Sequence, residues 1–319
     1  MAGGQERVLR RRIASVASTK KITRAMELIA ASRIKRAEVA VAQAVPYSEA
    51  ITNVVADLAA GGAAPDSPYL VPRPEIRRVA FVVLAGDRGL CGAYNSSVLR
   101  AAEGAVKEVL SDGRDYGLVT VGRKAEAYFR YRRYRIDAAF SGFTDRPAYE
   151  DARRIGQAVA ERFLAGTYDR VETIYTRFRS AGVQEVVRRP LIPLEREVVE
   201  GGDARPEPVP ETGAPAPTYE FEPSPGAILE QLLPRYVDAR LYAALLNAAA
   251  SEHAARQRAM KAATDNAEEL IRSLTRIMNR ARQDAITTEI MEIVGGAEAL
   301  RAARAAGRGE HHHALVVAE

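Results

Sequence analysis

Two long stretches of this sequence contain neither glycine nor proline. One spans residues 235–294, and the other spans residues 5–45. Both are rich in alanine, arginine, glutamate, leucine and methionine, which favour helices. At 1.5 Å per residue, the C-terminal stretch predicts a helix of roughly 90 Å. The N-terminal stretch, continued past Pro46 to about Ala60, predicts a helix of roughly 80 Å. A helix this long needs a partner along its length, so the sequence predicts a coiled coil.

The spacing of apolar residues supports this prediction. Near the N-terminus one broad stripe is formed by Leu9, Ile13, Val16, Ile22, Met26, Ile29 and Ile34. Near the C-terminus, spacings of three and four residues connect Ala267, Ile271, Leu274, Met278 and Ala281, followed by Ile286, Ile290 and Ile293. These are spacings of a coiled-coil seam. The two helices pair most simply as antiparallel partners, because the middle of the chain can return the path.

The middle of the chain predicts an α/β domain with a mainly parallel sheet, because strands and helices alternate there. Strands are expected at residues 79–86, 117–122, 135–140 and 170–179, and helices near 95–110, 123–131 and 149–165. A further run, residues 186–194, suits an edge strand, because Pro190 and Pro193 cannot donate to a β-ladder.

Two linkers separate these regions. Residues 195–226 hold seven of the 16 prolines, eight acidic residues and two basic ones, which predicts a flexible, polyproline-like segment. Residues 61–74 form a shorter linker. The expected domains are a helix over 1–60, an α/β domain over 75–194, a second helix over 227–300 and a polar extension over 301–319.

Composition excludes several function classes. The single cysteine, Cys91, rules out an internal disulfide and a zinc site built from cysteines. The sequence has no run of 18 apolar residues, which a membrane-spanning helix would need. The N-terminus lacks the apolar core of a secretory signal.

Enzyme motifs are missing as well. The loop over residues 86–92 (GDRGLCG) follows a strand and precedes a helix, but it has neither G-x-G-x-x-G spacing nor the Lys-Ser/Thr pair of a phosphate loop. We interpret it as an ordinary turn and expect no cofactor. His253 is expected to be a packing or surface residue in a helix, and the histidine run His311, His312 and His313 could give only weak metal binding. Cys91 has no histidine in the α/β region to act as its base.

The N-terminal helix is strongly basic. Residues 5–36 contain ten lysines or arginines and two acids, in a chain with net charge +5. A solvated helix face, an acidic protein partner and nucleic acid are all compatible with this charge. Basic residues here alternate with isoleucine, methionine and alanine, and no aromatic stacking set accompanies them, which argues against nucleic acid.

The residues also show a resemblance to a known family. The segments IASV (13–16), KITRAM (21–26) and AAS (30–32), the turn DRGLCG (87–92), and the segments SEHAARQRAMKAATDN (251–266) and RARQDAITTEIMEIV (280–294) resemble the gamma subunit of F-type ATP synthases. The similarity covers about residues 4–300. The order of these segments makes the resemblance specific.

The resemblance implies a rotating shaft without a catalytic site. In this family the terminal helices form an antiparallel coiled coil inside a ring of alpha and beta subunits. A Rossmann-like domain that binds no nucleotide forms the foot and contacts the epsilon subunit and the membrane c-ring. The implied contacts with beta or with its apolar bearing are Met26, Arg33, Arg36, Arg88, Arg282, Gln283, Ile290 and Ile293. A coiled-coil nucleic-acid-associated protein is the alternative.

Two further expectations follow. With Cys91 alone, the chain cannot have the dithiol switch of the photosynthetic form. The missing transit peptide and thiol insert favour a bacterium, and hence a peripheral protein on the cytoplasmic side of the inner membrane.

Overall fold

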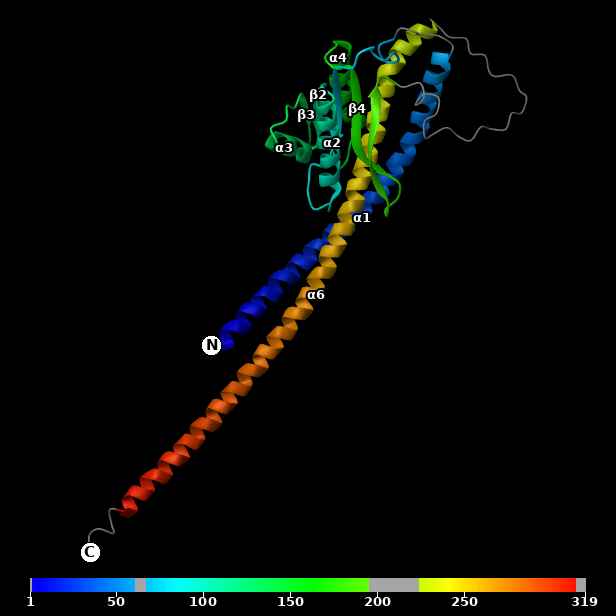
Figure 1. The fold of residues 1–319 in the computed structure, drawn as a ribbon. Helices are drawn as coiled ribbons and strands as arrows, with labels where there is room; N and C mark the ends of the chain where they lie inside the picture. Colours follow the sequence, from blue (N-terminus) through cyan, green and yellow to red (C-terminus); the bar gives the residue numbers. More distant parts are fainter. Residues whose placement is uncertain (1, 61–66, 195–223, 314–319) are drawn as a thin grey trace. The chain divides into compact units, whose positions relative to one another are not determined.

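The computed structural model describes residues 2–60, 67–194 and 224–313, so most of the expected acidic linker and part of the shorter one lie outside the described residues. In chain order the elements are α1 (Ala2–Ala60), β1 (Arg78–Leu84), α2 (Tyr94–Ser111), β2 (Asp115–Val121), α3 (Arg123–Tyr131), β3 (Ala138–Phe140), α4 (Tyr149–Leu164), β4 (Arg170–Phe178), β5 (Gln184–Ile192) and α6 (Pro225–His313) (Figure 1). The chain forms two compact units. The α/β unit is Met26–Met260, and the helical unit is made of Met1–Ala25 and Lys261–Glu319.

The sheet of the α/β unit has the strand order β3-β2-β1-β4-β5. Its first four strands are parallel, with Val82 of β1 opposite Val119 of β2 and Thr173 of β4. β5 runs antiparallel to β4 at the edge, where Pro190 lies opposite Glu172. The predicted parallel sheet and proline-bearing edge strand are therefore confirmed, and the order is that of a doubly wound fold.

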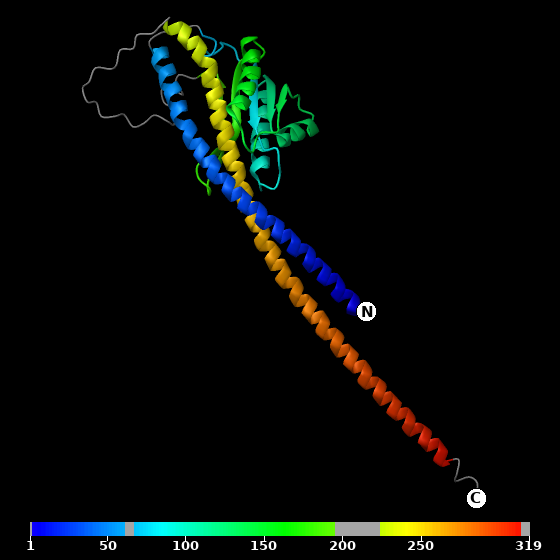
Figure 2. The ribbon, with the colours of Figure 1, turned by 180° about the vertical axis from the view of Figure 1, so that it is seen from behind.

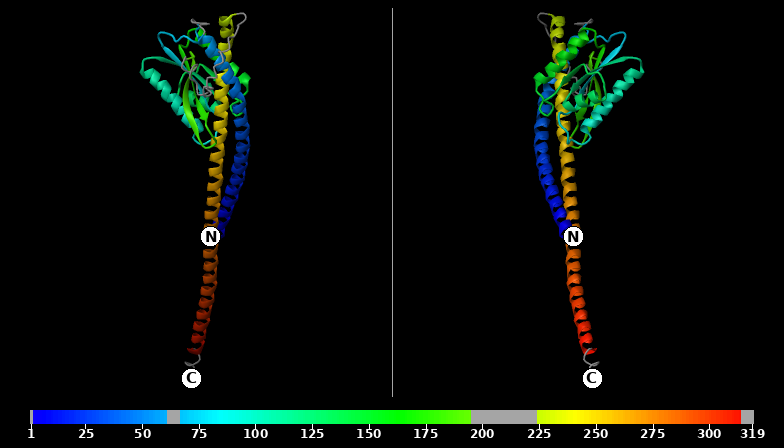
Figure 3. Two further views of the ribbon diagram at one scale, coloured as in Figure 1. Left: turned by 90° about the vertical axis from the view of Figure 1, so that its right-hand side faces the viewer. Right: turned by 90° about the vertical axis from the view of Figure 1, so that its left-hand side faces the viewer.

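Alternate residues of β1 point into two separate cores, because successive side chains of a strand face opposite sides of the sheet. Phe81 and Val83 pack with α2 and α3, and Val82 and Leu84 pack with α4 and the terminal helices. Figures 2 and 3 show these layers of the α/β unit from behind and from two sides. All four β1 side chains are buried, so helices cover both faces of the sheet.

Within the α/β unit, the end of α1 packs in the same core as the beginning of α6. The two segments lie side by side in every view (Figures 1, 2 and 3). Their buried residues are Ile51, Val55 and Leu58 from α1 and Leu229, Leu233 and Tyr236 from α6.

The helical unit shows the expected antiparallel pairing directly. Thr23 and Thr264 share a buried hydrogen bond of 2.8 Å, and Lys20 Nζ lies 3.0 Å from Glu268 Oε2. As the residue number rises in α1 it falls in α6, which fixes the direction. On α6 the predicted seam is confirmed from residue 267 to 281, because Ala267 and Leu274 are buried and Ile271, Met278 and Ala281 are partly buried. It is wrong for the following positions, since Ile286, Ile290 and Ile293 are exposed.

The predicted stripe on α1 is wrong at two positions. Ile22 and Ile29 are 61% and 54% exposed. The covered positions alternate by three and four residues and are Leu9, Ile13, Val16, Lys20, Thr23, Glu27, Ala30 and Ile34. Polar side chains occupy the middle of this heptad pattern, so counting only apolar residues shifts the stripe onto the neighbouring position.

The ends of several elements differ from the prediction. α6 continues through Gly295 and Gly296 to His313, because the flanking sequence is rich in alanine and other helix formers. β3 covers only Ala138–Phe140. Before it, the backbone N–H of Arg135 donates to the Tyr116 hydroxyl rather than to a strand carbonyl, and the Arg135 side chain donates to Asp115. Within the part of the chain that is described, neither long helix has a segment apolar enough to cross a bilayer.

Candidate functional site

The turn after β1, residues 86–92, is tied down by the carboxylate of Asp87. Its two oxygens accept hydrogen bonds from the backbone N–H groups of Arg123 (3.0 Å), Gly142 (2.9 Å) and Thr144 (3.1 Å), and from the Thr144 hydroxyl (3.0 Å). Burial alone would raise the pKa of Asp87, but these bonds outweigh burial and lower it. Asp87 therefore links the turn to the start of α3 and to the loop after β3.

Two glycines let other groups approach this turn. A Cβ on Gly86 would lie 2.9 Å from Glu252 Oε2 and 3.2 Å from Asn95 Oδ1, which accepts from the Gly86 N–H at 2.8 Å. Gly122 has φ +96°, and a Cβ there would lie 2.1 Å from the Ala85 carbonyl oxygen. Leu90, in contrast, has φ +61° although it is not glycine, and its side chain is 62% exposed. An exposed leucine in this conformation is costly to the fold, which marks the turn as a candidate functional surface.

Leu90 lines a groove of about 300 Å³ in the α/β unit. The groove is formed where the turn after β1 meets α1 and α6. The residues that line it are Met26, Ile29, Ala30, Arg33, Arg88, Gly89, Leu90, His253 and Arg256. It therefore combines an apolar floor with three arginines.

Ion pairs fix two of these arginines. Arg33 Nη1 lies 2.8 Å from Asp145 Oδ2, and Arg256 pairs with the buried carboxylate of Glu252 and donates to the Gly89 carbonyl oxygen at 3.3 Å. Arg88 is exposed and forms no ion pair with any residue in the described ranges. The Arg88 guanidinium is therefore available to an anionic partner.

Two titratable residues of α6 lie beneath the groove. Burial raises the pKa of Glu252, against the opposing effect of Arg256. Burial also lowers the pKa of His253, whose Nε2 lies 3.0 Å from the Asp145 carbonyl oxygen. Since His253 is neutral near pH 7, the positive charge of the groove comes from its arginines.

The residues implied by the family resemblance fall in both units. Met26, Arg33 and Arg88 line the groove, and Arg36 is exposed on α1, where it donates to the Ser32 hydroxyl at 3.1 Å. The other four, Arg282, Gln283, Ile290 and Ile293, are exposed on α6 in the helical unit.

Sequence reasoning missed Leu90 and Arg256 as parts of the groove, and Asp145 as the ion-pair partner of Arg33. Leu90 and Arg256 lie inside the motifs DRGLCG and SEHAARQRAM, so closer attention to those motifs could have found them. Asp145 gave no such signal, because only the folded loop after β3 brings it to Arg33. Of the two expectations for His253, a packing or a surface residue, the structure supports the first, since the side chain is 2% exposed.

No cluster of three or more metal-ligating side chains occurs among the residues that are described. The side chains of His311, His312 and His313 lie outside those residues. Cys91 is buried with a free thiol, and burial raises its pKa, so it is a poor nucleophile.

Comparison with known proteins places these features in a family. Residues 5–300 match the family model described as ATP synthase. The ATP synthase gamma chain of Frankia casuarinae is 50% identical over 301 residues, covering 93% of this chain and 98% of the relative. That of Mycolicibacterium smegmatis is 47% identical over 308 residues, covering 92% and 97%. Nothing in these matches supports the nucleic-acid alternative.

Solved structures share the fold. A chain of the Euglena gracilis mitochondrial ATP synthase (OSCP/F1/c-ring, rotational state 3) aligns with a TM-score of 0.63 at 17% identity, covering 95% of this chain and 96% of that one. A chain of the Tetrahymena thermophila mitochondrial ATP synthase (central stalk/c-ring) aligns with a TM-score of 0.56 at 23% identity, covering 76% and 99%.

Proposed function

The chain belongs to the ATP synthase gamma-chain family, and on that premise we propose that it is the rotating central stalk of a proton-translocating ATP synthase. Its rotation couples proton flow through the membrane c-ring to the conformational cycle of the catalytic beta subunits. In this role it has no catalytic site and needs no cofactor.

One observation carries this proposal: part of α6 has an apolar stripe that no described residue of the helical unit covers. Every residue from 286 to 303 is exposed. Apolar side chains recur on one face at Ile286, Ile290, Ile293 and Leu300. An apolar stripe of this length on a solvated helix favours an enclosing protein surface. We assign that surface to the ring of alpha and beta subunits.

The proposed mechanism is differential contact. A two-helix shaft presents different side chains in different directions, so each beta subunit around it meets a different surface. A beta subunit that is contacted differently populates a different conformation, and rotation moves those populations around the ring. The stripe at Ile290 and Ile293 serves as an apolar bearing that slides.

Arginines supply the breakable attractions of this mechanism. We propose that Arg33, Arg36, Arg88 and Arg282 meet acidic loops of beta, with Gln283 beside them and Met26 in the apolar floor of the groove. Exposed ion pairs contribute only about 0–1 kcal/mol each, so they can form and break during rotation. Among the described residues, Arg36, Arg88 and Arg282 form no ion pair, so their guanidinium groups are available to acidic side chains of beta.

The other partners and the location follow from the same role. We propose that the α/β domain, residues 75–194, is the foot that contacts the epsilon subunit and the c-ring. The helices over 1–60 and 227–300 form the shaft. The complex lies at the bacterial inner membrane, with this chain peripheral on the cytoplasmic side.

The test is to replace Arg282 and Gln283 by alanine in the assembled complex. We expect ATP-driven proton pumping per ATP hydrolysed to fall several-fold, while the circular dichroism of the purified chain is unchanged. The matched control is Arg100→Ala, which removes an exposed arginine from α2. Unchanged pumping and hydrolysis in the double variant would refute this assignment of the contacts.

A further inference from the structure

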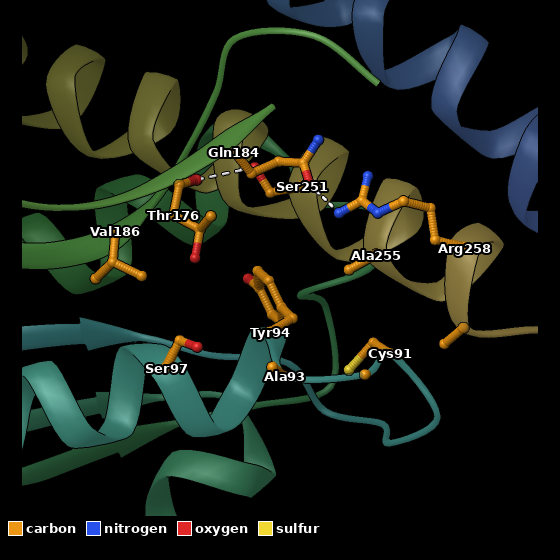
Figure 4. Close-up of a pocket in the computed structure, with 12 residues that line it drawn as sticks. Cys91, Ala93, Tyr94, Ser97, Thr176, Gln184, Val186, Ser251, Ala255 and Arg258 are labelled. Carbon is orange, nitrogen blue, oxygen red and sulfur yellow. Dashed lines mark hydrogen bonds between the residues drawn. The ribbon is translucent and has the colours of Figure 1, made fainter. Parts of the chain in front are cut away.

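A second cavity, of about 510 Å³, lies in the α/β unit outside the groove (Figure 4). It is bounded by the turn after β1, the first turn of α2, the adjoining ends of β4 and β5, and α6. In the strand order β3-β2-β1-β4-β5, the direction of chain winding reverses between β1 and β4. The cavity adjoins the carboxyl ends of these two strands, which is where doubly wound sheets bind their ligands.

The cavity wall contains a buried polar group without a partner. Thr176 of β4 is 5% exposed, and its Oγ1 forms no hydrogen bond with any described residue. Its backbone oxygen is satisfied, since it accepts from Ser251 Oγ at 3.1 Å. Figure 4 shows the Thr176 side chain directed into the same space as Tyr94 and Ser97 of α2. A buried hydroxyl left unpaired is destabilising, so this arrangement points to a missing acceptor.

The electrostatic environment favours a negatively charged acceptor. α2 begins at Tyr94 beside the cavity, and its N-cap residue, Ala93, has no side chain that could satisfy the free N–H groups. The N-terminus of a helix attracts anions. Arg258 of α6 also lines the cavity, and among the described residues no acidic side chain does so.

Hydrogen bonds hold Arg258 at the cavity and leave some of its donors free. It donates to the Ala181 carbonyl oxygen and to Gln184 Oε1. A guanidinium has five N–H groups, so these two bonds leave others for a ligand. Burial and the buried carboxylate of Glu252 raise the pKa of the lining residues Tyr94 and Cys91, and this carboxylate is itself paired with Arg256.

We propose that this cavity binds a phosphate group, either as inorganic phosphate or as part of a nucleotide. The hydroxyls of Thr176 and Ser97 donate to the phosphate oxygens, and the start of α2 together with Arg258 neutralises the charge. Thr176 and Arg258 belong to β4 and α6, far along the sequence from the turn after β1 and the start of α2. The site therefore leaves no phosphate-loop motif in the sequence. It goes beyond the stalk function and does not depend on it.

The experiment uses the full chain and isothermal titration with inorganic phosphate, with adenosine monophosphate and adenosine as parallel arms. Thr176→Val removes the unpaired hydroxyl and keeps both the side-chain volume and the backbone bond to Ser251. We expect saturable phosphate binding that weakens about tenfold in this variant. Ser111→Ala is the matched control, because it removes a hydroxyl from the far end of α2.

Each outcome decides the proposal. Saturable binding that weakens in Thr176→Val and not in Ser111→Ala supports it. Tighter binding of adenosine monophosphate than of phosphate then identifies a nucleotide as the source, and equal or weaker binding identifies the free ion. The proposal is overturned if neither phosphate nor adenosine monophosphate shows saturable binding, or if Thr176→Val leaves the binding unchanged. A second variant, Arg258→Gln, must also weaken phosphate binding, and unchanged affinity there would contradict the assigned role of the arginine.

Discussion

Asp238 of α6 makes the stability of the α/β unit depend on pH. It is 8% exposed and faces α4, where a Cβ on Gly156 would lie 2.1 Å from its Oδ1. Burial raises the pKa of Asp238 to about 6; Arg153 opposes this shift and Glu150 adds to it. The ordinary value is about 3.9. The buried Asp238 carboxylate, charged at neutral pH, therefore destabilises the folded state. We predict that Asp238→Asn removes this destabilisation, which is absent below about pH 4.

The sign follows from proton binding. Between pH 4 and 6 the folded state holds a proton on Asp238 that the unfolded state has lost. The free energy of unfolding therefore falls as pH rises through this window, and the stabilisation is fully present only below about pH 4, where the unfolded state is protonated as well. A difference of about two pH units corresponds to about 3 kcal/mol at most. Because water still reaches part of the carboxyl, we expect about 1–2 kcal/mol.

The assay is urea unfolding of the wild-type chain and of Asp238→Asn at pH 4 and pH 8, followed by near-ultraviolet circular dichroism. All 13 tyrosines lie between residues 47 and 242 and there is no tryptophan, so this signal reports the α/β unit. Comparing the difference between the two proteins at each pH cancels the other carboxylates. The variant should gain about 1–2 kcal/mol relative to wild type on going from pH 4 to pH 8. An equal difference at both pH values would refute the reasoning.

Two other predictions concern stability. Gly122→Ala should destabilise the α/β unit by at least about 2 kcal/mol, because the new Cβ meets the Ala85 carbonyl oxygen at 2.1 Å and φ is +96°. The control in the same urea assay is Gly104→Ala, whose new Cβ has open space around it. An equal loss of stability in both variants would contradict the prediction. Thr23→Val and Thr264→Val should each destabilise the helical unit, because each removes the buried hydrogen bond between the two hydroxyls. The double variant should lose less than the sum of the two single losses, because this bond can be lost only once. A double-mutant cycle in far-ultraviolet thermal melts checks this, and purely additive effects would count against it.

The long helices and the sheet could be predicted from sequence because their signals are local. Stretches without glycine or proline gave both terminal helices, and β-rich runs gave the parallel strands and the edge strand with Pro190. The position of the α1 seam could not be predicted well, because Lys20, Thr23 and Glu27 occupy covered positions. Their burial depends on the opposing α6 side chains, which the N-terminal sequence does not reveal.

The candidate surfaces were predictable to a different degree. The family motifs pointed to Arg88 and Arg33, but the Arg33–Asp145 ion pair joins residues 112 positions apart and needs the folded loop after β3. The phosphate cavity has no local signal, because Thr176 and Arg258 belong to different elements and meet only in the folded unit.

The four hydrogen bonds to Asp87 have a mechanical consequence. Arg88 follows a residue that is tethered to two other segments, so a pull on its guanidinium has little loop slack to take up. The load passes instead to β1, to the start of α3 and to the loop after β3. A push delivered at this single arginine would therefore move the sheet as one body.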